Sequence, residues 1–271
     1  MWRVARYPGL SVQVTLPAQR ATRNAQRMAR LRIVLVEPKE AGNVGAAARV
    51  MKNFGFDELW IAGEHPQLLP VSSWWASGAD DLLERLRFAP SLAEAIADAH
   101  VTVATTSMRG RTTPVTFAPR TLAEKFASMA EEQTLALVFG REDSGLTREE
   151  LVLCQHTVTI PTNDAFPTMN LAQSICVFCY ELSSIQPAPH ARELPDAATI
   201  ERIHQRARDL LLEVGFLHDN NPDRIYDDLR AIAARAELDA REATIVLGII
   251  RQIEWKIRSA PRGESDPGTP R

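Results

Sequence analysis

The sequence predicts an α/β fold built on a mostly parallel sheet, and two observations support that prediction. Short apolar or β-branched runs alternate along the chain with longer segments of helical periodicity, which is the pattern of a layered α/β domain. The short runs are apolar at nearly every position, as expected for parallel strands buried on both faces. The predicted strands span residues 31–36, 59–62, 101–105, 135–139 and 157–160.

The predicted helices lie between these strands, and local signals mark several of their ends. Gly55 can adopt the left-handed conformation that commonly ends a helix, so we expect it to cap the first one. Ser91 and Thr147 each precede a helix-like segment, and their hydroxyl groups can accept hydrogen bonds from the first free amides. The predicted helices span residues 46–54, 79–86, 92–99, 122–130 and 171–182.

The composition changes after residue 185, which predicts a second structural unit. Residues 31–185 would form the α/β domain, and the proline-containing segment 186–198 is predicted to be a linker. Residues 199–259 recover helical periodicity and predict a small appendage of two or three helices. Residues 260–271 contain three prolines and predict a disordered tail.

The first 30 residues contain six arginines and no acidic residue, so they are predicted to be a basic leader outside the domain. Organellar transit peptides have a similar arginine-rich, acid-poor composition. The favoured interpretation is that Met28, three residues before the first strand, is the true start, and that residues 1–27 are a leader or a disordered arm. A basic RNA-binding arm is the third interpretation.

Charge and composition argue against a general polyanion binder, a membrane-spanning protein and a disulfide-rich secreted protein. Outside the first 30 residues the chain has 25 basic and 34 acidic side chains, so any nucleic acid must be held on a local basic patch. No run approaches the roughly 18 apolar residues of a membrane-spanning helix. Three cysteines in 271 residues cannot form a disulfide framework, which predicts a reducing compartment and a cytoplasmic protein.

Common cofactor motifs are absent from the sequence, and no metal site is predicted. Neither a dinucleotide-binding G-x-G-x-x-G after the first strand nor a phosphate-binding P-loop occurs. Cys176 and Cys179 form a C-x-x-C inside an apolar helix-like run without a second ligand pair, so we expect core packing. His156 opens a strand and is expected to be structural.

The first of three polar, glycine-containing segments follows the first predicted strand. Gly42 and Gly45 would permit a tight turn and a close backbone approach. Asn43 would lie at the start of the helix, where its side chain caps free amides or binds a ligand. Arg49 and Lys52 fall on one helix face and form either a phosphate-binding patch or two solvated cations.

The second and third segments follow two later strands. Gly140 would let the backbone pass close to a flat ligand, and Glu142 is either a site carboxylate or a surface acid paired with its neighbouring arginine. Thr168 has a hydroxyl that can cap a helix or meet a ligand, Met169 supplies apolar bulk, and Asn170 supplies an amide. Ligand sites concentrate where parallel strands end, so three such segments together predict a site.

These three segments resemble motifs of the SpoU/TrmH family of RNA 2′-O-methyltransferases, within the SPOUT class. The first segment has the family pattern N-x-G-x-x-x-R, and the second has G-x-E-x-x-G after a strand. In the third, this chain has Thr-Met-Asn where Ser-Leu-Asn is usual, which leaves open the detailed role that the family gives to the serine. The resemblance spans residues 31–182 and implies a knotted (trefoil) domain that binds S-adenosylmethionine and acts as a homodimer.

The resemblance also implies roles for individual residues. Asn43, Arg49, Glu142 and Asn170 would be catalytic, with Arg49 stabilising the ribose oxygen or acting as a base. The RNA phosphates would contact Arg49, Lys52, Arg109 and Arg111. The methyl donor would contact Thr106, Ser107, Met108, Gly140, Ile160, Thr168, Met169 and Asn170.

Two further stretches resemble the TrmJ branch of the family, residues 106–111 and residues 214–217. That branch implies 2′-O-methylation of tRNA at nucleotide 32 of the anticodon loop. Methylation of ribosomal RNA and a knotted RNA-binding protein without catalysis stay as alternatives. Trp74 and Trp75 would pack in the core or in a dimer, or stack on bases. Arg109, Arg111 and Arg120 are either solvated charges or RNA contacts.

Overall fold

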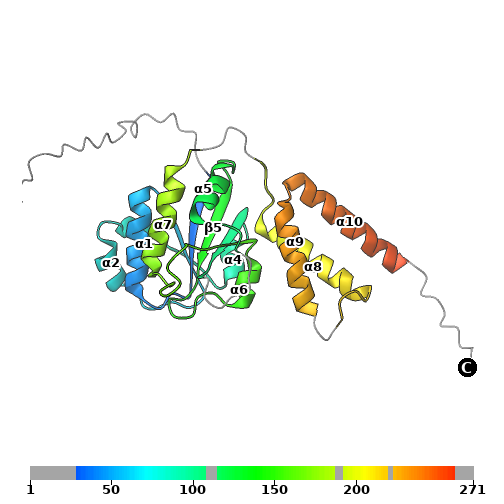
Figure 1. The fold of residues 1–271 in the computed structure, drawn as a ribbon, viewed down its shortest axis with the longest axis horizontal. Helices are drawn as coiled ribbons and strands as arrows, with labels where there is room; N and C mark the ends of the chain where they lie inside the picture. Colours follow the sequence, from blue (N-terminus) through cyan, green and yellow to red (C-terminus); the bar gives the residue numbers. More distant parts are fainter. Residues whose placement is uncertain (1–28, 108–114, 187–191, 219–221, 260–271) are drawn as a thin grey trace, which may run out of the picture.

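A computed structural model of the chain describes residues 29–107, 115–186, 192–218 and 222–259 (Figure 1). Its strands are β1 (Arg30–Val36), β2 (Glu58–Ala62), β3 (Arg87–Ala89), β4 (Val101–Thr105), β5 (Thr134–Phe139) and β6 (His156–Val158). Its helices are α1 (Ala41–Phe54), α2 (Val71–Ala76), α3 (Asp80–Glu84), α4 (Leu92–Ile96), α5 (Pro119–Ala127), α6 (Arg148–Leu153), α7 (Leu171–Ser184), α8 (Ala197–Glu213), α9 (Pro222–Ala236) and α10 (Ala240–Ser259).

The sheet confirms the predicted α/β class. The strands run in the order β3-β2-β1-β5-β4-β6, and every pair in the described part of the chain is parallel. All six residues of β5 are buried, as its continuous apolar run predicted. Because the strands are parallel, the segments that follow them all leave from one edge of the sheet. The trefoil knot stays a prediction.

Two layers of helices cover the sheet. On one face, α1, α5 and α7 bury the larger apolar cluster, which includes Ile33, Leu137 and Phe178. On the other face, α4 and α6 cover a smaller cluster around Val34 and Val138. Alternate residues of each strand face opposite clusters, as the two-residue period of a strand requires. Figure 1 shows α1 and α7 on one side of the sheet and α4 and α6 on the other.

The structure confirms the predicted caps and corrects several boundaries. Gly55 ends α1 with φ at 82°, and the hydroxyls of Ser91 and Thr147 accept amide hydrogen bonds at the starts of α4 and α6. Helix α1 begins at residue 41 rather than 46, so Gly42 and Gly45 are helical and do not form a turn. Strand β3 was not predicted, and β6 ends two residues earlier than expected.

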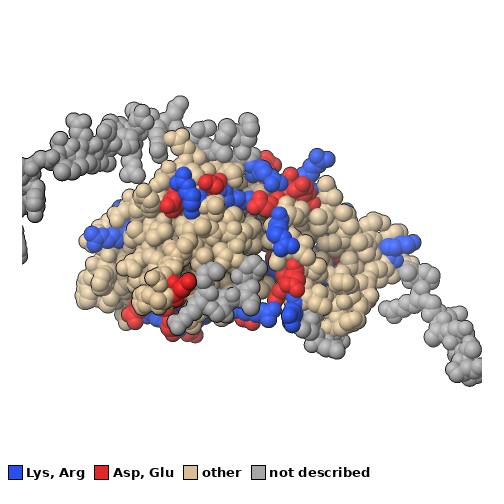
Figure 2. Space-filling model, viewed as in Figure 1, with Lys and Arg blue, Asp and Glu red and all other residues tan. Residues whose placement is uncertain are grey.

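Three helices, α8 to α10, form the C-terminal appendage that the sequence predicted. Their apolar cluster includes Ile203, Leu210 and Ile250. Asp196 caps α8, so the predicted linker ends in the first residues of a helix. Figure 2 shows acidic and basic side chains mixed along the boundary with the α/β domain, where Lys125 pairs with Glu237. Among the described residues, no helix is both long and apolar enough to cross a membrane.

Gly45 allows α1 and α2 to pack closely. A Cβ atom added to Gly45 would lie 2.0 Å from the backbone oxygen of Ser72, so Gly45→Ala should destabilise the fold by about 1–3 kcal/mol. Gly248, in α10, is the control, because a Cβ there would meet no atom within 4 Å. Gly248→Ala should stabilise the protein by about 0.5–1 kcal/mol. Urea denaturation of both variants measures these changes, and equal effects would contradict the packing argument.

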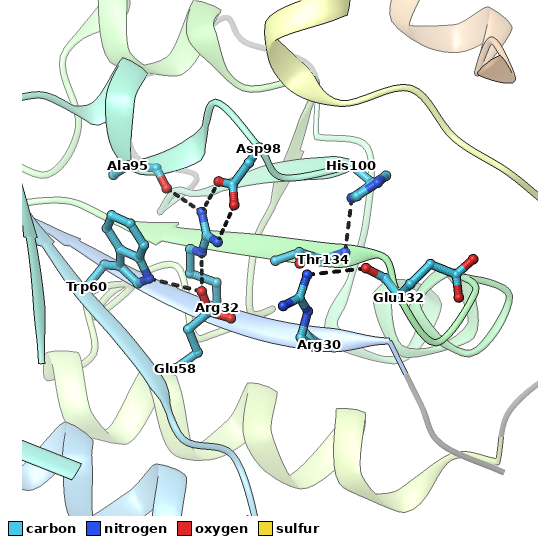
Figure 3. Close-up of polar contacts among 9 residues, drawn as sticks. All are labelled: Arg30, Arg32, Glu58, Trp60, Ala95, Asp98, His100, Glu132 and Thr134. Atoms are coloured by element: carbon cyan, nitrogen blue, oxygen red, sulfur yellow. Dashed lines mark hydrogen bonds and ion pairs between the residues drawn. The ribbon is translucent and has the colours of Figure 1, made fainter. Parts of the chain in front are cut away.

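A buried arginine, Arg32, lies near the start of the inner strand β1 and is held by several polar contacts (Figure 3). The side chain of Arg32 is 2% exposed, and its Nε donates to Glu58 at 2.7 Å. Its Nη1 and Nη2 donate to the two carboxylate oxygens of Asp98 at 2.5 and 2.9 Å. The Ala95 carbonyl accepts a further hydrogen bond, and the Trp60 ring stacks on the guanidinium at 4.5 Å. This cation is therefore fully paired, as burial requires.

The Arg32 ion pair should make stability depend on pH. The hydrogen bond from Arg32 lowers the pKa of the Asp98 carboxyl below its usual value of about 3.9. A lowered folded-state pKa contributes stability that is present above that usual value and is lost as pH falls through the folded pKa. The free energy of unfolding should therefore fall more steeply below pH 4 in the wild type than in Asp98→Asn. Parallel curves from pH 7 to pH 2 would contradict this prediction.

Candidate methyl-transfer site

The three predicted segments meet at the edge of the sheet where the parallel strands end. The first forms the start of α1, the second follows β5, and the third leads into α7. Hydrogen bonds between side chains of Glu142, Asn43 and Asn170 connect all three segments. We call these three side chains the polar network.

Glu142 lies against the N-terminus of α1. Its carboxylate accepts hydrogen bonds from the backbone amides of Lys39 at 2.8 Å and Glu40 at 3.3 Å, and from Nδ2 of Asn43 at 2.9 Å. A carboxylate is favourable there because helix N-termini carry free amides and a partial positive charge. Glu142 is not a surface acid paired with Arg141, which was the alternative prediction.

Asn43 occupies the centre of the network. Its Oδ1 accepts a hydrogen bond from Nδ2 of Asn170 at 3.1 Å while its Nδ2 donates to Glu142. Asn170 is itself fixed because its Oδ1 caps α7 by accepting from the amides of Ala172 and Gln173. The predicted capping role of Asn43 is wrong, since Asn43 lies inside α1 and binds side chains instead.

Arg49 is exposed and lies two turns beyond Gly42 on the outer face of α1. Within the part of the chain that the structure describes, no hydrogen bond or ion pair joins Arg49 to Asn43 or Glu142. An exposed guanidinium without an internal partner is suited to meeting a phosphate or a developing oxyanion.

Gly140 is required by the packing of its own loop. A Cβ atom at Gly140 would lie 2.2 Å from the backbone carbon of Gly145, which is closer than real Cβ contacts. The amide of Gly145 donates to the Arg141 carbonyl at 2.9 Å, so the loop closes tightly on itself. The backbone of the same loop therefore approaches Gly140, and the approach of a flat ligand stays a prediction.

Several residues predicted to contact a methyl donor follow the carboxyl ends of parallel strands, at the same edge of the sheet as the polar network. The amide of Thr106 bonds to the Val158 carbonyl at 3.0 Å, which ties the end of β4 to the end of β6. Thr106, Ser107, Ile160 and Met169 are half-buried. They offer hydroxyl, backbone and apolar groups of the kinds that contact a ligand with a flat aromatic ring and polar arms. Thr168 and Asn170 are exposed beside them.

Other predicted residues have different outcomes. Lys52 donates to the Gly78 carbonyl and pairs with Asp81 at 2.5 Å. In this structure its ammonium group therefore binds the segment between α2 and α3. Arg120 lies near Glu124 and Glu181. Three predicted contacts lie outside the described residues: Met108, Arg109 and Arg111.

Trp74 and Trp75 are 72% and 60% exposed, so the prediction of core packing is wrong for both. A Cβ atom added to Gly42 would lie 3.0 Å from the ring of Trp75, which therefore packs beside the start of α1. For both tryptophans, stacking on RNA bases and packing in a dimer interface stay predictions.

His156 and Cys179 are buried, as predicted, whereas Cys176 is half-buried. Burial lowers the pKa of His156 to about 4, and its ring packs edge-on against Phe117. Cys179 is fully buried, and burial raises the pKa of its thiol to about 12. Among the residues with described positions, no group of three histidine, cysteine or acidic side chains could hold a metal ion.

Two acidic residues beside the site were missed by the sequence analysis. Glu37 and Glu150 both bind Arg141, at 2.9 and 3.0 Å. The spacing from Thr147 to Glu150 matches a helix capping box, and this pattern could have placed Glu150 at the start of α6. Nothing in the local sequence indicates the contact between Glu37 and Arg141, which are separated by 104 positions.

Comparisons with known proteins agree with this geometry. The SpoU rRNA Methylase family profile matches residues 30–180, and the profile of the tRNA methyltransferase TrmJ C-terminal domain matches residues 198–264. The tRNA (cytidine/uridine-2′-O-)-methyltransferase TrmJ of Cronobacter sakazakii is 34% identical over 85% of this chain and 98% of its own length. The uncharacterized tRNA/rRNA methyltransferase LasT of Escherichia coli K12 is 39% identical over 70% of this chain and 84% of its own length.

A solved structure supports the same arrangement of both parts of the chain. The crystal structure of TrmJ from Z. mobilis ZM4 superimposes with a TM-score of 0.73 at 28% sequence identity. The similarity covers 83% of this chain and all of that chain, so it includes the C-terminal helices as well as the α/β domain.

Proposed function

This chain belongs to the SpoU family of RNA methylases, and from that premise we propose that it transfers a methyl group from S-adenosylmethionine to a ribose 2′-hydroxyl of tRNA. The observation that carries the proposal is the polar network, because it joins the three family motifs at one edge of the sheet. The C-terminal TrmJ domain and the relatives named as tRNA methyltransferases support tRNA as the substrate.

The residues of this chain have separable roles in such a reaction. S-adenosylmethionine would supply the methyl group, whose bond to sulfur breaks as its bond to the 2′-oxygen forms, leaving S-adenosylhomocysteine and releasing the hydroxyl proton to solvent. Arg49 binds a phosphate beside the target ribose and stabilises the negative charge that develops on the 2′-oxygen. The polar network holds the start of α1 and the start of α7 in a fixed relation, so that ribose and donor meet in line. This transfer requires no metal ion.

We further infer that the target is nucleotide 32 of the anticodon loop and that the enzyme works as a cytoplasmic homodimer. The resemblance to the TrmJ branch supports the nucleotide. The exposed Trp74 and Trp75, beside the start of α1, supply apolar surface of the kind that subunit interfaces bury. Sedimentation of the purified protein tests the dimer directly.

The test of function is transfer of labelled methyl from S-adenosylmethionine to unmodified tRNA, with ribosomal RNA in parallel and the labelled nucleotide mapped. We expect label on the 2′-oxygen of nucleotide 32. Label on ribosomal RNA alone would replace the tRNA proposal with the ribosomal alternative. Absence of label on both RNAs, with RNA binding retained, would favour a binding protein without catalysis.

A further inference from the structure

Arg141 lies next to Glu142 in the loop after β5, but its side chain reaches different partners. Its Nε donates to Glu37 at 2.9 Å, and its Nη1 and Nη2 each donate to a Glu150 oxygen at 3.0 Å. The side chains of Arg141 and Glu150 are only 14% and 16% exposed. We call Arg141, Glu37 and Glu150 the arginine clasp.

The arginine clasp joins three elements around one short loop. Glu37 follows β1, Arg141 follows β5, and Glu150 lies in the first turn of α6. A paired, two-point contact between a guanidinium and a carboxylate fixes orientation as well as distance. The backbone of Arg141 also exchanges two hydrogen bonds with Gly145, at 2.9 and 3.3 Å. Both the main chain and the side chain of Arg141 are therefore held.

The backbone at Glu37 is in a conformation that few residues with side chains adopt. Its φ is 43°, in the left-handed region, which is unfavourable for a residue other than glycine. Gly63 makes room for it, because a Cβ there would lie 2.9 Å from the Glu37 side chain. The strained turn directs the Glu37 carboxylate to Arg141. Strain of this kind persists only where surrounding contacts fix it.

We infer that Arg141 is a positioning residue that acts through Glu142. By holding the loop against β1 and α6, it keeps the Glu142 carboxylate on the amides of Lys39 and Glu40 and on Asn43. The inference rests on the proposed function for its kinetic consequence, but the position of Glu142 can be measured without RNA. If the clasp only stabilised the fold, the effect of removing Arg141 on the reaction rate would be independent of the effect of removing Glu142.

A double-mutant cycle separates the two roles. Arg141→Ala and Glu142→Ala should each lower kcat for tRNA methylation by about tenfold or more, and the double variant should fall within about threefold of Glu142→Ala. The KM for tRNA should change by less than about threefold in Arg141→Ala, because the Arg141 side chain is largely buried. Arg141→Lys should recover part of the rate, since lysine keeps the charge without the paired contact.

Hydrogen exchange gives a readout that needs neither substrate nor activity. The amides of Lys39 and Glu40 donate to Glu142, so both Arg141→Ala and Glu142→Ala should speed their exchange, by about tenfold. Arg206→Ala is the matched control, because it removes a similar paired contact with Glu254 in the C-terminal helices. That control should leave exchange at Lys39 and Glu40 unchanged.

The outcomes distinguish this inference from the proposed function. The positioning role would be overturned if the loss of kcat in the double variant equalled the product of the two single losses. Unchanged amide exchange at Lys39 and Glu40 in Arg141→Ala would also overturn it. If Arg141→Ala fails to fold, Glu37→Gln removes one charge and keeps an acceptor, and it should give a smaller change of the same kind. A wild-type protein that methylates no RNA, yet shows the exchange response, would refute the proposed function and keep the clasp.

Discussion

Arg49→Ala should lower the rate of tRNA methylation by about 10²–10³-fold, the loss expected when one group that stabilises a developing oxyanion is removed. The affinity for S-adenosylmethionine and the melting temperature should stay near those of the wild type. The reason is structural, because Arg49 is exposed and no ion pair with another described residue holds its guanidinium. Single-turnover kinetics, calorimetric donor binding and thermal melting measure the three quantities.

Two companion variants sharpen the test of Arg49. Arg49→Lys keeps the positive charge but loses the two-pronged contact with phosphate, so an intermediate rate is expected. Arg251→Ala removes another exposed arginine, on α10, and should leave the rate within about twofold of the wild type. Turnover near the wild-type rate in Arg49→Ala would eliminate the proposed role of this residue.

Asn43→Asp should lower the methylation rate by about 10- to 100-fold at pH 8, and the loss should shrink as the pH falls. The substitution keeps the acceptor for Asn170 but replaces the donor to Glu142 with a carboxylate oxygen. A hydrogen bond to a charged group contributes about 1.5–3 kcal/mol, which sets the expected loss. Two carboxylates at hydrogen-bond distance raise the pKa of one of them.

The pH dependence follows from that raised pKa. Below it, one carboxyl of the pair holds a proton and can donate again, so the rate of Asn43→Asp relative to wild type should increase toward lower pH. Asn53→Asp is the matched control, since Asn53 is exposed on the same helix. It should keep the wild-type profile. A pH-independent loss in Asn43→Asp would show that the charge conflict with Glu142 is not the cause.

Much of the α/β domain could be predicted because its strands are apolar on both faces. β5 is an example, as all six of its residues are buried. β3 could not be predicted, because only one of its three residues is buried and so its sequence lacks a strand pattern. The start of α1 was missed because glycine disfavours helices, yet contacts with α2 and with Glu142 outweigh that local preference.

The members of the candidate site could be named from the sequence, but their connections could not. The polar network joins residues separated by 99 and 127 positions. Local propensity contains no information about such pairs. Glu142, for example, lies on the amides before α1 and on Asn43. The clasp of Arg141 was missed for the same reason, since only its capping partner Glu150 is local.

The spacing of the polar network has a consequence for newly made protein. Asn170 donates to Asn43 across 127 positions, so a chain that is still being synthesised cannot complete the network until α7 has left the ribosome. Growing chains add about 5–20 residues per second, so roughly 6–25 seconds pass between the synthesis of the two residues. During that interval, Asn43 and Arg49 are present without the rest of the site. We therefore expect unfinished chains to be inactive toward the RNA that surrounds them.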